Sequence, residues 1–123
     1  MEDLANPVVH LQLRTSNLPR AAAFYTQLFG WRAETIHVCS TTYLALELGR
    51  EIDGGVVERD SGDPSWLPYV EVAELGSALH RAQRLGARLV LPPREGPAGW
   101  RAVIEAPDGA EIAFWQQKHG SSP

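Results

Sequence analysis

The side chains best suited to chemistry begin on a short alternating segment near the amino terminus. In residues 8–14, His10, Gln12 and Arg14 alternate with apolar residues, which predicts a strand with one polar and one apolar face. A histidine on such a face can act as a general base or bind a metal ion. It can equally be a hydrogen-bonded wall residue that contacts a ligand. The polar face of this strand is therefore the first candidate for a site.

Glutamates on later predicted strands have the parity to share a concave face with His10. They are Glu47, Glu58, Glu71 and Glu111. If these carboxylates converge, mutual repulsion and partial desolvation would raise the pKa of some of them. A raised pKa suits a general base, and the same carboxylates could instead provide counter-charges for a cationic ligand. For Glu58 a solvated ion pair with Arg59 or Arg14 is the competing interpretation.

Aromatic side chains extend the predicted ligand site. Trp66 begins a predicted strand, Trp100 follows a loop rich in Gly and Pro at residues 93–99, and Trp115 shares the parity of Glu111. Tyr69 has the parity of Glu71. Flat rings of this kind can stack on a planar ligand, although they also pack subunit interfaces. The loop at 93–99 is either a connector or a lid.

Two segments with the same order of predicted elements would position these side chains. Asn17 and Gly30 are the expected start and stop signals of a first helix, and a second helix is expected to stop at Gly86. The stops differ by 56 positions (86 − 30), and the Asp-Gly turn signals at Asp53 and Asp108 differ by 55 (108 − 53). This nearly constant offset predicts a duplicated unit, with two chance β-α segments as the alternative.

The duplication predicts an α+β fold in one domain spanning residues 1–123. It would contain two βαβββ modules, at about 7–60 and about 65–117, that form a curved mixed sheet around a cavity with the helices outside. A length of 123 residues with 44% hydrophobic content suits one compact domain with a core. Open sheet edges and an apolar flank further predict a homodimer.

Charge and composition exclude several classes of partner. The net charge is −4 and the 11 Lys and Arg residues are scattered, so neither nucleic acid nor a membrane surface is an expected partner. There is no apolar run of membrane-spanning length and no secretory pattern, which predicts a cytoplasmic protein. The only cysteine, Cys39, cannot form an internal disulfide and is interpreted as a small, buried or half-buried apolar residue.

Three segments together carry a resemblance to a known family. They are Val-His-Leu-Gln-Leu-Arg at 9–14, Asn-Leu-Pro-Arg-Ala-Ala-Ala-Phe-Tyr-Thr-Gln-Leu-Phe-Gly-Trp at 17–31, and Ala-Pro-Asp-Gly-Ala-Glu-Ile-Ala-Phe-Trp at 106–115. With them, residues 7–116 resemble the vicinal oxygen chelate superfamily, which includes glyoxalase I, bleomycin resistance proteins and extradiol dioxygenases. The Phe-Tyr…Leu-Phe-Gly-Trp and Pro-Asp-Gly stretches are the most specific, and both report the fold rather than an activity.

In metal-using members, the resemblance implies a divalent ion held by one ligand from the first strand and one from the last strand of each module. The corresponding residues are His10 and Glu58 in the first module, and Leu67 and Ala113 in the second. Neither Leu67 nor Ala113 can bind a metal. Glu71 and Glu111 lie two residues from those positions, roughly 6.5 Å along a strand, which is too far for a metal bond near 2 Å. No metal cofactor is therefore expected, and a divalent ion is the alternative.

Three functions remain open. The first is a metal-independent protein that resembles the bleomycin resistance branch and binds a small molecule in a cavity lined by tryptophan and glutamate. The second is a glyoxalase-like lyase, isomerase or hydrolase that uses His10 and Glu58 as catalytic residues, with or without a metal. The third is an interaction domain without a small-molecule ligand. The predicted ligand-binding residues are Gln12, Arg14, Glu47, Trp66, Tyr69, Glu71, Trp100, Glu111 and Trp115.

Overall fold

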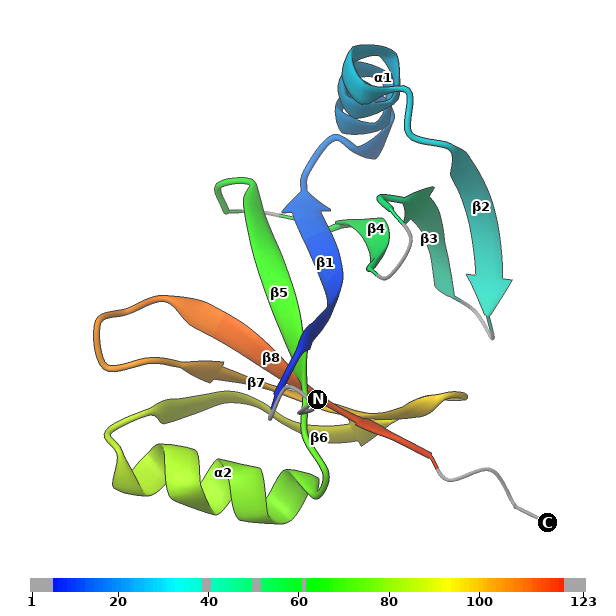
Figure 1. Ribbon diagram of the computed structural model, residues 1–123. Coiled ribbons are helices and arrows are strands. Elements are labelled where there is room, and N and C mark those ends of the chain that lie inside the picture. The colour runs from blue at the N-terminus through cyan, green and yellow to red at the C-terminus, as the bar shows by residue number, and fades with distance from the viewer. Residues whose placement is uncertain (1–5, 39–40, 50–51, 61, 119–123) are drawn as a thin grey trace, which may run out of the picture. The chain divides into compact units, whose positions relative to one another are not determined.

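A computed structural model describes residues 6–38, 41–49, 52–60 and 62–118, so Cys39 lies outside the described residues. The same order of elements occurs twice (Figure 1). The first set is β1 (Val8–Thr15), α1 (Leu18–Phe29), β2 (Ala33–Val38), β3 (Thr41–Glu47) and β4 (Asp53–Glu58). The second set is β5 (Ser65–Glu71), α2 (Leu75–Arg84), β6 (Arg88–Glu95), β7 (Gly99–Glu105) and β8 (Glu111–Gln117). The predicted α+β class and the repeated βαβββ order are confirmed.

The chain divides into two compact units, and the division falls inside β5. Val9–Pro68 make up one, called here the N-terminal unit; the residues from Tyr69 onward, with those up to Val8, make up the C-terminal unit. In the part of the chain that the structure describes, neither helix is long and apolar enough to cross a membrane.

The N-terminal unit contains strands in the order β2-β3-β4-β1. β1 and β4 are parallel, and the other two pairs are antiparallel. Leu13, Leu46 and Val56 form a buried cluster, against which Leu18 and Tyr25 of α1 pack. The odd-numbered residues of β1 thus face α1, which leaves the even-numbered ones, including His10, on the other face.

Helix α1 begins and ends at the residues expected from the sequence. The Asn17 side chain accepts a hydrogen bond from the Arg20 amide at 3.1 Å, and Pro19 lies in the first turn. Gly30 ends the helix in the left-handed conformation with φ 73°, which a residue without a Cβ adopts at little cost.

The C-terminal unit has the matching strand order β5-β8-β7-β6. β5 and β8 are parallel, and β8, β7 and β6 form antiparallel pairs. Helix α2 contacts these last three strands. Its Leu75 and Leu79 pack against Ala102, Ile104 and Phe114. Arg101 and Trp115 alternate with these core residues along β7 and β8, and Tyr69 pairs with Ala113 next to Phe114. All three side chains therefore lie on the sheet face turned away from α2.

Two turn predictions need correction. Asp53 and the two glycines after it were expected to form a turn, but they begin β4, where Gly54 and Gly55 are buried. β6 also continues through Pro92 and Pro93 to Glu95, so the expected loop shrinks to residues 96–98. β6 is the last strand in its unit's order, and proline is tolerated in an edge strand because it need not donate a ladder hydrogen bond.

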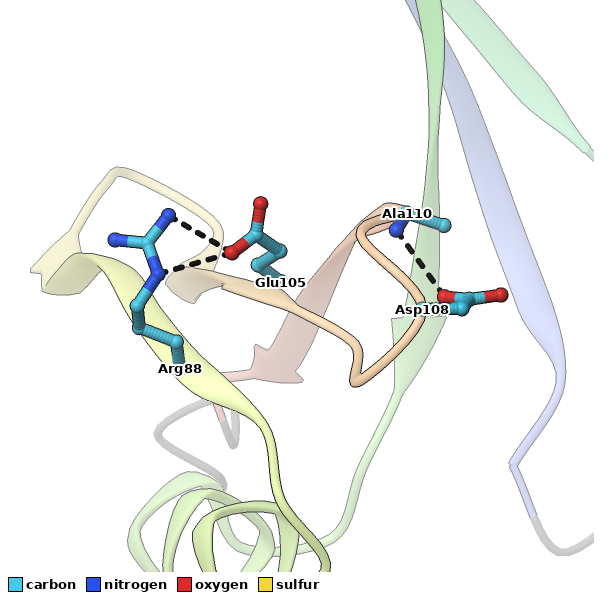
Figure 2. Close-up of polar contacts among 4 residues, drawn as sticks. All are labelled: Arg88, Glu105, Asp108 and Ala110. Carbon is cyan, nitrogen blue, oxygen red and sulfur yellow. Dashed lines mark hydrogen bonds and ion pairs between the residues drawn. The ribbon is translucent and has the colours of Figure 1, made fainter.

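The expected turn at 107–109 is present. The Asp108 carboxylate accepts a hydrogen bond from the Ala110 amide at 3.2 Å, and Gly109 has φ 97° (Figure 2). This local bond closes the connection between β7 and β8. The two Asp-Gly pairs are therefore not equivalent: one lies in a turn and the other begins a strand.

Candidate functional site

On the N-terminal unit, the face turned away from α1 places His10 beside the carboxylate of Asp53 and carries a second carboxylate, Glu47, one strand further on. His10 pairs with Asp53 across β1 and β4, and Asp53 pairs with Glu47 across β4 and β3. Directly paired residues project to the same face. Glu47 therefore joins His10 as predicted from parity, whereas Asp53 was missed because it had been assigned to a turn.

Burial lowers the pKa of His10 below its ordinary value of 6.5. The negative charge of Asp53 and a side-chain hydrogen bond with Gln12 act in the opposite direction but are smaller effects. The imidazole is therefore mostly unprotonated at neutral pH. An unprotonated ring nitrogen can accept a proton or bind a metal ion.

Gln12 and Arg14 follow His10 on the same face, and each has a defined neighbour. Gln12 pairs with Gly55, and a Cβ added to Gly55 would lie 3.6 Å from the His10 ring atoms Cε1 and Nε2. The absence of a side chain at Gly55 leaves room beside the ring. Arg14 donates a hydrogen bond from Nη2 to the Ser65 hydroxyl at 2.8 Å. Arg14 thus ties β1 to the start of β5.

The structure does not bring Glu58 to His10. Glu58 pairs with Thr15, on the face of β1 that α1 covers, and its Oε2 accepts a hydrogen bond from the Leu18 amide at 3.0 Å. It also lies five positions beyond Asp53, the partner of His10 (58 − 53), which is roughly 16 Å along a strand. Opposite faces and this separation keep the two side chains from sharing one ion. Glu58 instead satisfies an amide at the start of α1.

The resemblance implies a ligand position on the last strand of the first module, and the strand registers put a residue other than Glu58 there. If His10 corresponds to Leu67, then Gln12 corresponds to Tyr69, two residues further along each strand. Gln12 pairs with Gly55 and Tyr69 pairs with Ala113, so Gly55 rather than Glu58 occupies the position equivalent to Ala113. Among the described residues, no three His, Cys, Asp or Glu side chains are grouped so that they could hold a metal ion.

On the C-terminal unit, one line of paired residues crosses the sheet on the face turned away from α2. Glu71 of β5 pairs with Trp115 of β8, which pairs with Arg101 of β7, which pairs with Arg94 of β6. These four residues are called the Trp115 row. Glu71 and Trp115 were predicted from parity, whereas the two arginines were not. Arg94 had been assigned to a loop and its position depends on bulges in β6, while Arg101 is in regular register with Trp115.

Tyr69, two residues before Glu71 in β5, contacts one member of the Trp115 row. Its hydroxyl accepts a hydrogen bond from Arg101 Nη1 at 3.3 Å, although β8 lies between β5 and β7. The Tyr69 side chain can reach across β8 because its direct partner there is Ala113, whose methyl group is fully buried. The small side chain of Ala113 thus makes room for a tyrosine that contacts the arginine.

The Trp115 indole lies against the backbone of Gly99. A Cβ added to Gly99 would come within 2.7 Å of Trp115 Cζ2 and would also meet the Gln116 carbonyl oxygen. Trp115 remains partly exposed. Gly99 therefore provides the flat surface on which the indole rests. The sequence showed only that this glycine follows Pro97 and Ala98, which does not indicate such a contact.

The remaining acidic residues of this face lie at the other end of the strands. Glu111 pairs with Glu105, and Glu105 Oε1 accepts from both Nε and Nη2 of Arg88, at 2.9 and 2.8 Å (Figure 2). Arg88 thus compensates one charge of this like-charged pair. Glu111 lies on the face of Trp115, as predicted. Along β8, the residues on this face are Glu111, Ala113 and Trp115.

The other predicted aromatic residues are placed elsewhere. Trp100 pairs with Gln116, on the face that carries α2, and is 37% exposed. Trp66 belongs to the N-terminal unit, where its ring meets Tyr25 of α1 edge-on with centroids 5.4 Å apart. Neither tryptophan is therefore part of the Trp115 row.

Leu67, the residue after Trp66, is buried and has no atom that could bind a metal ion.

An apolar pocket of about 710 Å³ lies on the α1 side of the N-terminal unit. Several of its rings stack on one another, such as Tyr25 with Trp31 at 6.1 Å. These contacts attach α1 to its sheet and account for the pocket's aromatic character. The lining residues are Leu11, Tyr25, Phe29, Trp31, Leu48, Gly49, Ile52 and Trp66.

Comparison with known proteins identifies the family. A model described as the Glyoxalase/Bleomycin resistance protein/Dioxygenase superfamily matches residues 8–114. This range covers most of the 123 residues, and the chain therefore belongs to this superfamily. The resemblance found in the sequence is confirmed.

Individual relatives are distant. "Putative glyoxylase CFP32" of Mycobacterium bovis and the protein of that name from Mycobacterium tuberculosis are each 26% identical to this chain over 114 residues. The match covers 86% of this chain but 44% of each relative, so the chain spans less than half of their length.

Solved structures share the fold at low identity. The hypothetical protein BH1468 from Bacillus halodurans aligns with a TM-score of 0.75 and 13% identity, covering 98% of this chain and 100% of that one. Methylmalonyl-CoA epimerase from Mycobacterium tuberculosis aligns with a TM-score of 0.69 and 15% identity, covering 94% and 90%. Likeness at these identities establishes the fold alone.

Proposed function

We propose that this protein binds a small organic molecule with a planar part on the polar sheet face of the C-terminal unit, without a resident metal ion. The observation that carries the proposal is the Trp115 indole, supported by Gly99 and flanked in its row by Arg101. A partly exposed indole held against a backbone is an ordered stacking surface, so little side-chain freedom is lost on binding. Polar groups beside it would orient the ligand.

The residues at the family's ligand positions favour binding without a metal. Leu67 and Ala113 have no donor atoms, and the registers put Gly55 at the fourth position. Only His10 could ligate, whereas a protein metal site needs three or four ligands. Of the four glutamates expected to line the ligand site, we include only Glu71 and Glu111 in the proposed site, because these two share the face of Trp115.

A second candidate function, proton transfer in an enzyme, is favoured by His10. Its lowered pKa keeps the imidazole in the form that accepts a proton, and the Asp53 carboxylate would stabilise the cation formed. The names of a glyoxylase and of methylmalonyl-CoA epimerases among the similar proteins are compatible with such an activity. Glu58 is not part of this proposal, because it binds the start of α1.

The binding proposal is tested with a panel of planar aromatic acids, amides and thioesters, measured by calorimetry and by the NMR signal of the Trp115 indole N–H. We expect saturable binding of some panel members that is lost in Trp115→Ala and retained in Trp100→Ala, because Trp100 lies on the opposite face. No binding by any member, or equal loss in both variants, would reject the proposal. Conversion of a ligand that stops in His10→Gln but continues in Glu58→Gln would instead select the enzyme.

The predicted homodimer also remains a proposal, now with a surface to examine. Helix α1 has no buried residue, and Phe24, Leu28 and Phe29 are 56, 57 and 55% exposed. Covering such side chains is the usual contribution of a subunit interface. The cytoplasmic location and the exclusion of nucleic acid and membrane partners stay predictions from composition.

A further inference from the structure

We propose that Arg94 and Arg101 together bind an anionic group of the ligand, a carboxylate or a phosphate, while its planar part stacks on Trp115. This inference rests on the proposed function and adds the chemical class of the ligand. It differs from the cationic ligand for which the predicted group of glutamates could provide counter-charges.

The two arginines form a like-charged pair. Arg94 and Arg101 are direct partners on the antiparallel strands β6 and β7, so their side chains leave the same face from Cβ atoms about 5 Å apart. Like charges in this position destabilise a sheet. An anion placed between the two guanidinium groups would remove the repulsion and accept hydrogen bonds from both.

Two of the nearby carboxylates are engaged in ion pairs with other residues. Glu95, next to Arg94, lies on the other face and forms an ion pair with Lys118 at 2.7 Å. Glu105 is held by Arg88 (Figure 2). Glu71 is in the same row as Arg101, but Trp115 separates the two residues. Within the described ranges, neither arginine of the pair forms an ion pair.

Arg101 is partly oriented for such binding. Its Nη1 donates to the Tyr69 hydroxyl at 3.3 Å, and its other N–H groups have no hydrogen-bond partner among the described residues. A guanidinium has five N–H donors in a planar fork, which suits the oxygens of a carboxylate or a phosphate. Trp115 is the direct neighbour of Arg101, so one ligand could contact the ring and the charge together.

The test uses three probes that share one ring system: 2-naphthoate, 2-naphthyl phosphate and the neutral 2-naphthamide. We expect at least one anionic probe to bind about tenfold more tightly than the amide, and this preference to weaken as NaCl rises from about 50 to about 500 mM. The stronger of the two anions identifies whether a carboxylate or a phosphate is preferred. Affinities are measured by calorimetry on the full chain.

Arg94→Gln and Arg101→Gln should each reduce the affinity for the anions roughly fivefold or more relative to the affinity for 2-naphthamide, so that the preference for an anion falls. Arg84→Gln on α2 is the matched control, because it removes the same charge from an exposed site outside the face. Equal affinity for the anions and the amide, or no effect of Arg94→Gln, would reject the arginine pair while the stacking proposal stands. If none of the three probes binds, both proposals fail.

Discussion

Burial of the His10 imidazole makes the stability of the folded protein depend on pH. The pKa in the folded protein lies below the ordinary 6.5, so between these two values the unfolded chain binds more protons than the folded one. The stability associated with neutral His10 is therefore fully present above about pH 6.5 and is lost as the pH falls toward the folded pKa.

Removing the charge of Asp53 should lower the pKa of His10 further. Asp53 attracts the protonated imidazole, so Asp53→Asn removes a contribution that raises the pKa. The measurement is an NMR titration of the His10 Cε1–H signal in buffer with a chelator. Asp60→Asn, at an exposed position outside this face, is the control and should leave the titration unchanged. A rise of the His10 pKa in Asp53→Asn would contradict the proposed pairing.

Gly99 should tolerate no side chain. Alanine at this position would place its Cβ against the Trp115 ring and the Gln116 carbonyl, and the forced shift should cost about 1–3 kcal/mol of unfolding free energy. Urea unfolding of Gly99→Ala measures this loss. Gly96→Ala is the matched control, since the nearest atom to its Cβ would be at an ordinary 3.7 Å. Equal stability of the two variants would show that the indole does not rest on Gly99.

At the scale of elements, Glu58 should act on the stability of α1 and not on chemistry. Its carboxylate accepts from the Leu18 amide beside the Asn17 cap, so Glu58→Ala should cost about 1 kcal/mol. Urea unfolding and helix content by circular dichroism measure the effect. Glu34→Ala, another exposed strand glutamate, should change neither. If Glu58→Ala left stability unchanged but abolished ligand binding, the prediction would be wrong and Glu58 would be a binding residue.

The elements themselves were largely predictable because their signals are local. Asn17, Pro19 and Gly30 mark the ends of α1, and alternation in β1 separates its two faces. Strand pairing is not local. The register of β1 against β4 decides that Asp53 and not Glu58 meets His10, and no periodicity within either strand contains that information.

For the molecule as a whole, the sequence predicted the fold and the family, but only part of the candidate site. Parity correctly grouped Glu71, Glu111 and Trp115 on one face. Arg94 escaped prediction because bulges in β6 shift its pairing, and bulges leave no reliable pattern in a single sequence. Arg101 is in regular register with Trp115, but that pairing between two strands is not visible in the alternation of either one.

Metal removal is the prediction that belongs to the whole protein. With one donor among the family's ligand positions, incubation with EDTA should shift the melting temperature by less than about 1 °C and leave ligand affinity unchanged. Thermal unfolding with and without EDTA, followed by addition of Zn, Ni, Mn or Fe, measures this. A drop of several degrees that one of these metals restores would establish a bound ion and contradict the proposal.

The tyrosine that reaches over Ala113 also restricts which side chains position 113 can accept. A carboxylate or imidazole introduced at position 113 would enter the space through which Tyr69 contacts Arg101. A metal ligand placed at position 113 would thus be introduced at the expense of the tyrosine–arginine contact.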